Sequence, residues 1–178
     1  MQPCRVHITG ASGSGVTTLG RALAQRWSVP AHDTDDYFWE PGVPPYSTRR
    51  PIEERLHLMQ RMFVPCRSWV LTGSLMGWGD PLIAHFDLVV FLYLAPEERL
   101  ARLRTRETQR YGAAEIAPGG RRHSKFSAFM EWAGNYDQPD FPGRSKARHL
   151  VWLDTLPCPV MHLDSSEPVD TLIRRLEK

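Results

Sequence analysis

The residues from Gly10 to Thr18 read GASGSGVTT and have the composition of a phosphate-binding loop. Glycines let successive backbone N–H groups turn toward an anion, and the dipole of a following helix adds to that attraction. The spacing of Gly10, Gly15 and Thr17 meets the pattern GxxxxGK[ST], except that Val16 stands in place of lysine. We therefore expect phosphate groups to bind at Gly10, Ala11, Ser12, Gly13, Ser14, Gly15, Val16, Thr17 and Thr18.

The missing lysine is the main departure from that pattern. Such a lysine bridges the outer phosphates of a nucleotide, and a charge-assisted hydrogen bond of this kind contributes roughly 1.5–3 kcal/mol. The glycines and the hydroxyls of Thr17 and Thr18 are retained, so we expect phosphate binding and leave catalytic competence open. A plain tight turn between strand and helix is the alternative interpretation of the glycines.

Carboxylates and aromatic rings cluster between Asp33 and Trp39, which read DTDDYFW. This segment falls at the expected end of a second strand, and ligands of open parallel sheets bind beyond the carboxyl ends of the strands. One carboxylate there can order a magnesium ion and its waters, and another can hold or deprotonate an acceptor hydroxyl. The alternative is a solvated turn whose aromatic rings pack against the core.

Four arginines share one face of the helix predicted after the fourth strand. Arg99, Arg102, Arg106 and Arg110 follow one another at spacings of 3, 4 and 4 residues. Like charges at i+4 destabilise an isolated helix by about a few tenths of a kcal/mol per pair. An anion or nearby carboxylates would reduce this repulsion between the arginines. We expect Arg102 and Arg106 to point toward phosphates and to replace part of the charge absent at Val16. A solvated basic face is the alternative.

These groups need a scaffold that brings the ends of several strands together. Short apolar runs predict buried strands, and a period of 3.6 residues predicts helices between them, so we expect an α/β fold with a parallel sheet. The apolar runs lie at 6–9, 69–72, 88–94 and 159–164, with a short extended segment before Asp33. A helix that begins after Pro51 has an expected buried stripe of Ile52, Leu56, Met59 and Phe63.

Two irregular stretches are expected on the acceptor side of the site. The segment 40–51 is rich in proline and turn-forming residues, and its Arg49 and Arg50 either contact an anionic acceptor or lie on the surface. Glycines crowd the segment 73–81 after the third strand, so backbone there can approach a ligand. Trp78 in this loop either offers a flat surface to the ligand or packs on the core.

We expect one domain over residues 1–178, with a lid insert at about 107–144. Residues that interrupt helices and strands, such as glycine and proline, are frequent at both ends of this insert. A short helix with apolar residues is expected in its middle. Closure of such a lid over a bound nucleotide would exclude water from phosphoryl transfer. Arg144 and Arg148 lie one helical turn apart, where both can face the phosphates when the lid shuts.

The composition argues against several other classes of protein. The chain has 178 residues and a net charge of +2, which is too small for a protein that wraps nucleic acid through bulk electrostatics. Its three cysteines are dispersed and lack CxxC spacing, which predicts free thiols in a reducing compartment. Neither an apolar leader nor a membrane-length apolar run is present in the sequence. We therefore expect a cytoplasmic protein, monomeric or homodimeric, without nucleic-acid or membrane partners.

With the glycine loop, the Asp33–Asp36 segment and the arginine helix in hand, the chain resembles the nucleoside monophosphate kinase-like group of P-loop proteins. This group includes adenylate, shikimate and gluconate kinases. The resemblance is greatest to bacterial adenylate-kinase-like ATPases, which share the stretches DTDDYFW at 33–39 and GSLxGWGDP at 73–81. It implies a three-layer P-loop fold with a parallel sheet in the order 2-3-1-4-5, a helical lid, and ATP with Mg²⁺ as cofactors.

The resemblance also implies roles for particular residues. The P-loop, Gly10 to Thr18, would hold the ATP phosphates, with Thr17 on magnesium. Asp33 and Asp35 match the paired aspartates that shikimate and gluconate kinases use near the metal and the acceptor hydroxyl. Arg102 and Arg106 match the arginines beside the lid that brace the transferred phosphoryl group.

Two departures qualify the resemblance. Val16 replaces the lysine, and Thr72 stands where adenylate kinases have an aspartate at the end of the third strand. Asp33 and Asp35 therefore become the expected metal support. The sequence predicts an ATP-dependent small-molecule kinase with an unidentified acceptor. The alternative is a nucleotide-binding protein with little or no catalysis, such as a sensor or a slow NTPase.

Overall fold

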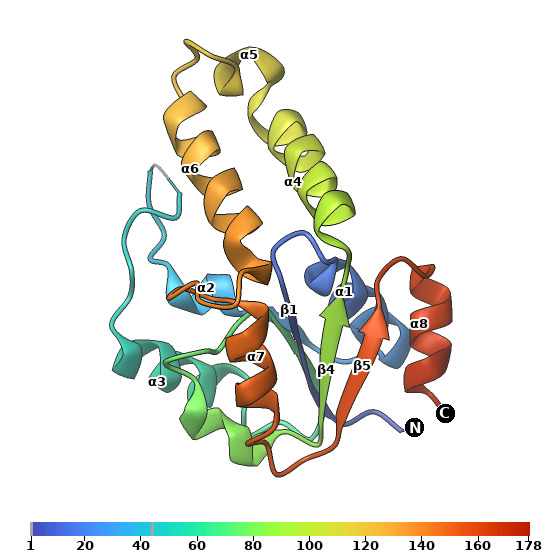
Figure 1. Cartoon of the computed structure of the whole chain (residues 1–178). Helices are drawn as coiled ribbons and strands as arrows, with labels where there is room; N and C mark the ends of the chain where they lie inside the picture. The colour runs from blue at the N-terminus through green and yellow to red at the C-terminus, as the bar shows by residue number, and fades with distance from the viewer. Residues whose placement is uncertain (1, 44) are drawn as a thin grey trace.

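A parallel sheet runs through the centre of the computed structural model, which describes residues 2–43 and 45–178 (Figure 1). Its strand order is β2-β3-β1-β4-β5, so the predicted α/β fold class and strand order are confirmed. The strands are β1 (Arg5–Gly10), β2 (Ala31–Asp33), β3 (Trp69–Thr72), β4 (Leu88–Tyr93) and β5 (Val160–Asp164). The α-helices are α1 (Val16–Trp27), α2 (Thr34–Phe38), α3 (Ile52–Met62), α4 (Pro96–Tyr111), α5 (Ala113–Ile116), α6 (His123–Gly134), α7 (Lys146–Leu153) and α8 (Val169–Leu176). Two 3₁₀ turns, η1 (Asp80–His85) and η2 (Asn135–Asp137), complete the described elements.

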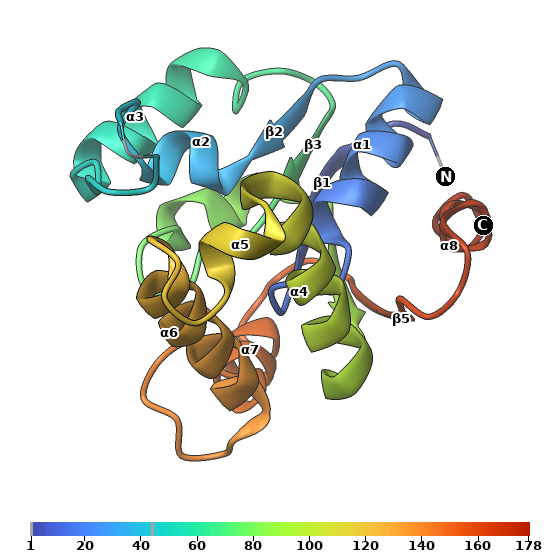
Figure 2. The same cartoon turned by 90° about the horizontal axis from the view of Figure 1, so that it is seen from above.

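Helices cover both faces of this sheet, as its apolar strands require. One core cluster joins α1 and α8 to the sheet through residues such as Leu19, Leu23 and Leu172. The other cluster joins α2, α3 and α7 to the opposite face through Tyr37, Met59 and Leu153. Figure 2 shows α1 and α8 on one side of the sheet and α3 and α7 on the other. The carboxyl ends of the strands are left open toward α4 and α6.

The predicted buried stripe of α3 is wrong at its first position. Ile52 is 45% exposed, whereas Arg55, which borders the predicted stripe, is only 6% exposed. The Arg55 guanidinium lies 3.8 Å from the centre of the Phe38 ring, and its Nε donates to the Arg50 carbonyl over 2.7 Å. A stacked and hydrogen-bonded guanidinium can take an inward position that the apolar pattern does not predict.

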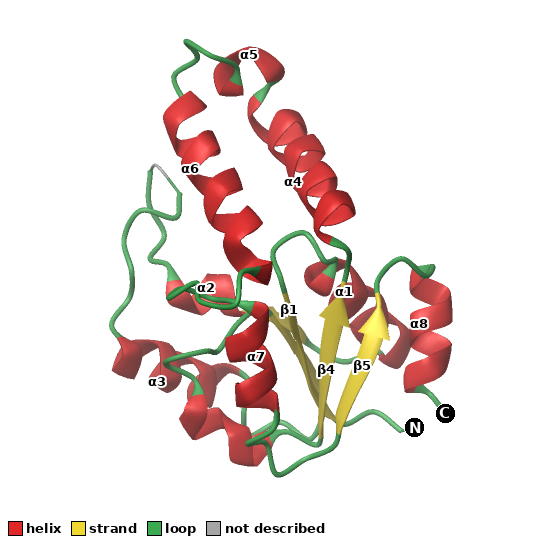
Figure 3. Cartoon of the chain, in the orientation of Figure 1, coloured by secondary structure: helices red, strands yellow, loops and turns green. Residues whose placement is uncertain are grey.

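The expected lid segment, 107–144, begins inside α4 rather than at its end. Helices α4 and α6 contact each other and project beyond the sheet, with α5 at the tip between them (Figure 3). At the base of this projection Arg99 of α4 joins α4 to α6 and η2: it is fully buried and donates to the Ala133 carbonyl (2.8 Å) and to Asp137 (2.6 Å). Among the described helices, none is long and apolar enough to cross a membrane.

Candidate functional site

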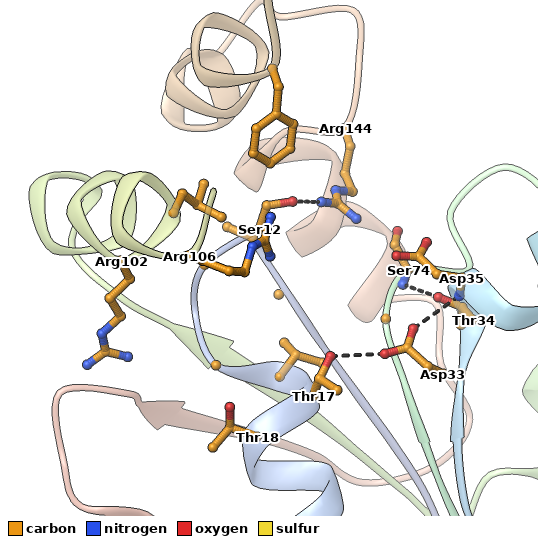
Figure 4. A pocket seen from close by; sticks show the side chains of 18 of the residues that line it. Ser12, Thr17, Thr18, Asp33, Thr34, Asp35, Ser74, Arg102, Arg106 and Arg144 are labelled. Carbon is orange, nitrogen blue, oxygen red and sulfur yellow. Dashed lines mark hydrogen bonds between the residues drawn. The ribbon is translucent and has the colours of Figure 1, made fainter. Parts of the chain in front are cut away.

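A pocket of about 1590 Å³ lies where the strand ends meet the projecting helices (Figure 4). Nearly all of the predicted site residues line it. These are Gly10, Ala11, Ser12, Gly13, Gly15, Val16, Thr17, Thr18, Asp33, Asp35, Arg102 and Arg106. The exception is Ser14, which is fully buried and whose hydroxyl donates to the Ala11 carbonyl over 2.8 Å. The structure therefore brings the three predicted groups, the loop, the aspartates and the arginines, around one cavity.

The loop between β1 and α1 has a backbone that two glycines make possible. Gly13 and Gly15 have φ values of 85° and 87°, in the left-handed region that residues with a Cβ rarely adopt. A Cβ on Gly13 would also lie 2.6 Å from the Arg99 carbonyl oxygen, so this glycine is required for α4 to cross the loop closely. Gly15 caps α1, whose amino-terminal end therefore faces the pocket. Backbone donors and a helix dipole suited to an anion are both in place.

Val16 lies at the start of α1, where the pattern has lysine. The side chain is 9% exposed and packs in the core cluster with Leu19 and Leu23, although it also borders the pocket. An apolar side chain there extends the core to the edge of the loop. Any cation for the outer phosphates must then come from another part of the chain.

Asp33 is the hydrogen-bonding centre of the pocket. Its Oδ2 accepts from Thr17 Oγ1 over 3.0 Å and from Thr72 Oγ1 over 3.2 Å. Its Oδ1 accepts from the backbone N–H of Asp35 over 3.1 Å and so caps α2. Asp33 and Thr72 are register partners on the neighbouring strands β2 and β3. The carboxylate of Asp33 therefore lies beside Thr72, the position at the end of β3 where adenylate kinases have an aspartate.

The Thr17–Asp33 pair has the donor types that magnesium accepts. Mg²⁺ keeps several waters and is held by one or two carboxylates together with substrate phosphates. In the part of the chain that the structure describes, no group of three or more His, Cys, Asp or Glu could hold a metal ion. One hydroxyl and one carboxylate beside a phosphate loop therefore fit Mg²⁺ bound with a nucleotide, and they do not fit a metal site made by protein ligands alone.

Asp35 lies on the side of the pocket beyond Asp33 and the P-loop. Burial raises its pKa above the ordinary value for an aspartate, and the nearby charge of Asp33 raises it further. Arg144 and a hydrogen bond from the Trp39 side chain act in the opposite direction. A carboxylate with a raised pKa, in contact with solvent inside a pocket, is suited to accept a proton from an acceptor hydroxyl.

The arginines of α4 bind different partners. Arg102 donates to the Ser165 hydroxyl (3.3 Å) and carbonyl (3.2 Å), and the Ser165 hydroxyl in turn donates to the Ser14 carbonyl (2.5 Å). Arg102 therefore lies beside the turn after β5, next to the loop. Arg106 pairs with Glu107 at 2.9 Å on the same wall. Arg99 is buried among backbone carbonyls and Asp137 and does not line the pocket.

Comparison with known proteins agrees with this geometry. A family model described as "AAA domain" matches residues 6–118, which include the loop, Asp33 and the arginine helix. The chain belongs to this AAA domain family. The uncharacterized protein YqaC of Bacillus subtilis (strain 168) is 40% identical over 171 residues, covering 96% of this chain and 94% of the relative. A cytidylate kinase of Archaeoglobus fulgidus is 25% identical over 114 residues, covering 58% of this chain and 62% of that enzyme.

A solved structure shows the same fold. The shikimate kinase from Bacteroides thetaiotaomicron has a TM-score of 0.56 and 19% sequence identity, covering 98% of this chain and 96% of that one. Together with the family match, this likeness confirms that the AAA domain protein has the P-loop, kinase-like fold of the nucleoside monophosphate kinase-like group. The predicted recognition is thus confirmed, and the roles of individual residues remain predictions.

Aromatic rings and an arginine line the side of the pocket where the sequence predicts an acceptor. Phe38, Trp39 and Trp78 line the pocket together with Arg49. Arg50, in contrast, donates to the backbone carbonyl of Tyr37 and does not line the cavity, so the two arginines of the loop have different environments.

Arg144, which the sequence predicts only to face the phosphates when the lid shuts, contacts the P-loop directly in this structure. Arg144 donates from Nη2 to Ser12 Oγ over 2.6 Å, which makes it a direct neighbour of the P-loop (Figure 4). The sequence offered only its position beside the lid as a signal, because nothing in the local pattern distinguishes Arg144 from the neighbouring Arg148. Arg148 instead donates to the Gly143 carbonyl over 3.3 Å.

Proposed function

We propose that this protein is an ATP-dependent small-molecule kinase. The observation that carries the proposal is the contact between Thr17 on the P-loop helix and Asp33 at the end of β2, with Asp35 beside them in the same pocket. A plain tight turn has no need of a carboxylate at this place. The AAA domain match and the kinase-like relatives support the same interpretation.

The proposed reaction is an in-line transfer of the γ-phosphoryl group. A bond forms between the acceptor oxygen and the γ-phosphorus while the bond to the β–γ bridging oxygen breaks, and ADP leaves. Asp35 accepts the proton of an acceptor hydroxyl. The backbone N–H groups of the P-loop orient the phosphates, and Arg102 and Arg106 stabilise the developing charge. Thr17 and Asp33 would hold Mg²⁺, which when bound neutralises charge on the β- and γ-phosphates.

The acceptor is expected between Asp33–Trp39, Arg49 and Gly73–Asp80. Carboxylates favour the hydroxyl of a polyol, sugar or nucleoside, whereas Arg49 and the aromatic rings favour a nucleotide. We propose a protein of the cytoplasm with these small molecules as its partners, active as a monomer or homodimer.

A second function is favoured by Val16 alone. A P-loop without its lysine can still bind nucleotide through backbone donors, while lid closure over the nucleotide signals occupancy to a partner. In that case the protein is a nucleotide-binding sensor or a slow NTPase.

Two measurements in sequence test the proposal. Thermal unfolding with ATP, ADP, GTP or GDP, each with and without magnesium, detects any ligand that binds the folded state. We expect a magnesium-dependent rise in melting temperature with ATP. ADP release is then measured across a panel of polyols, sugars, nucleosides and nucleoside monophosphates. Release that depends on one acceptor supports the kinase, slow release independent of all acceptors supports the sensor or NTPase, and no shift with any nucleotide contradicts both.

A further inference from the structure

Arg144 is held against the P-loop from a distant part of the chain. It lies between α6 and α7, just before Ser145, whose hydroxyl caps α7. Its guanidinium reaches Ser12 in the loop, 132 residues away in sequence, and lies 5.0 Å from the centre of the Trp132 ring. Figure 4 shows the guanidinium of Arg144 between Ser12 and Asp35, and both are pocket residues.

The charge of this guanidinium is not neutralised by an ion pair. Among the described residues, no carboxylate lies within ion-pair distance of Arg144. Its Nε is buried and has no hydrogen-bond partner, and among the described residues its side-chain acceptor is the neutral Ser12 hydroxyl. Burial accordingly lowers the pKa of Arg144, which the electrostatic interaction with Asp35 only partly offsets. A half-buried, uncompensated cation of this kind is stabilised when an anion arrives.

The other arginines near the loop have their own partners. Arg99 is paired with Asp137 and Arg106 with Glu107, whereas Arg102, like Arg144, has only neutral partners, the hydroxyl and carbonyl of Ser165. Of these four arginines, Arg144 is the one without an ion pair whose guanidinium donates to a side chain of the P-loop, so its charge lies beside any anion bound on that loop.

We propose that Arg144 binds the outer phosphates of the nucleotide and so replaces the P-loop lysine. This inference rests on the proposed nucleotide site. The sequence-based expectation instead has Arg102 and Arg106 compensate for Val16, and lets Arg144 and Arg148 face the phosphates only when the lid shuts. Because Arg144 already contacts the P-loop, the replacement charge is in place before a nucleotide binds.

The test distinguishes a role of the Arg144 charge in nucleotide binding from a purely structural role of its contact with Ser12. Arg144→Gln keeps a hydrogen-bond donor for Ser12 and removes the charge, whereas Arg144→Lys keeps the charge. Dissociation constants of the full chain are measured for adenosine, AMP, ADP and ATP with magnesium, and the melting temperature of each variant checks its folding. Arg26→Ala is the matched control, because Arg26 is exposed, pairs with Glu177 and does not line the pocket.

We expect Arg144→Gln to weaken ATP binding about 10- to 150-fold, the range of a hydrogen bond to a charged group, and to leave adenosine and AMP within about twofold. Arg144→Lys should retain most of the affinity for ATP. Unchanged ATP binding by Arg144→Gln overturns the assignment. An equal loss for all four ligands also overturns it, because it identifies a structural latch. If the wild-type protein binds no nucleotide, both the proposed function and the assignment of Arg144 are contradicted.

Discussion

The floor and the wall of the pocket are built in different ways. The pocket floor consists of Gly10–Gly13, Gly15–Thr18, Asp33 and Asp35, and these groups are held by backbone geometry, by each other and by the buried Thr72 behind Asp33. The arginine wall consists of Arg102, Arg106 and Arg144, which come from α4 and from the chain before α7 and bind three unrelated partners.

This difference shows where the site can change without loss of the fold. A change in the floor alters strand register, loop geometry or a helix cap, because the same groups make the fold and the site. A cation in the wall can come from any element that reaches the phosphates. The floor has kept the P-loop backbone while its lysine is replaced by valine, and the wall offers guanidinium groups that can take over its charge.

The largest expected effect comes from the floor, at the carboxylate proposed to accept the proton. Asp35→Asn should lower the rate of phosphoryl transfer about 10²- to 10⁴-fold, the usual contribution of a general base. In the wild type, activity should fall as the pH drops through the raised pKa of Asp35, because protonated Asp35 cannot accept a proton. A pH–rate profile of both proteins tests this. A variant with wild-type turnover would contradict the role.

The same substitution should have the opposite effect on stability. Because the pKa of Asp35 is higher in the folded than in the unfolded chain, the folded state binds this proton more tightly. Its contribution to stability is therefore present at low pH and is lost as the pH rises through the folded pKa. At neutral pH the charged carboxylate is destabilising, so Asp35→Asn should raise the melting temperature. Asp154→Asn is the matched control for activity, because Asp154 is exposed and does not line the pocket.

The second effect in size is expected at the other aspartate of the floor. Asp33→Asn keeps a cap for α2 but removes the charge beside Thr17. We expect about a 10- to 100-fold loss of activity or metal affinity, as for other groups that orient a metal site. A magnesium titration of ADP release should show the loss mainly as a higher magnesium requirement. An equal loss at saturating and limiting magnesium would assign Asp33 to structure alone.

The floor was largely predictable from the sequence; for the wall, the sequence singled out Arg102, Arg106 and Arg144 but not their partners. Glycine spacing, apolar runs and the rule for parallel sheets place the loop and Asp33 at the same sheet edge, because each signal is local or follows from topology. The partners of Arg99, Arg102 and Arg144 depend on tertiary contacts across 34 to 132 residues of sequence. Spacing on a helix groups arginines by face, but it does not show which of them a neighbouring segment will bury.

Within the wall, Arg102 and Arg106 should differ in kind. Arg106→Ala should slow transfer about tenfold, near the low end for a charged hydrogen bond, because its side chain is 47% exposed and already paired with Glu107. Arg102→Ala should slow transfer and in addition weaken nucleotide binding, since its partner Ser165 links it to the turn after β5. Separate values of kcat and KM for ATP distinguish the two effects. Full activity in both variants would show that neither Arg102 nor Arg106 contributes to nucleotide binding or phosphoryl transfer.

The smallest effect on activity is expected where the two regions meet, at Val16. Val16→Lys restores the P-loop pattern, yet we expect less than about a threefold change in transfer rate, because the wall already supplies the charge. The substitution should lower stability by about 1–2 kcal/mol, since a buried valine is lost and the lysine stem recovers only part of its packing. In the Arg144→Gln background the same lysine should recover most of the lost ATP affinity. A large increase in transfer rate from Val16→Lys in the otherwise wild-type chain would show that the arginine wall does not replace the charge of the P-loop lysine.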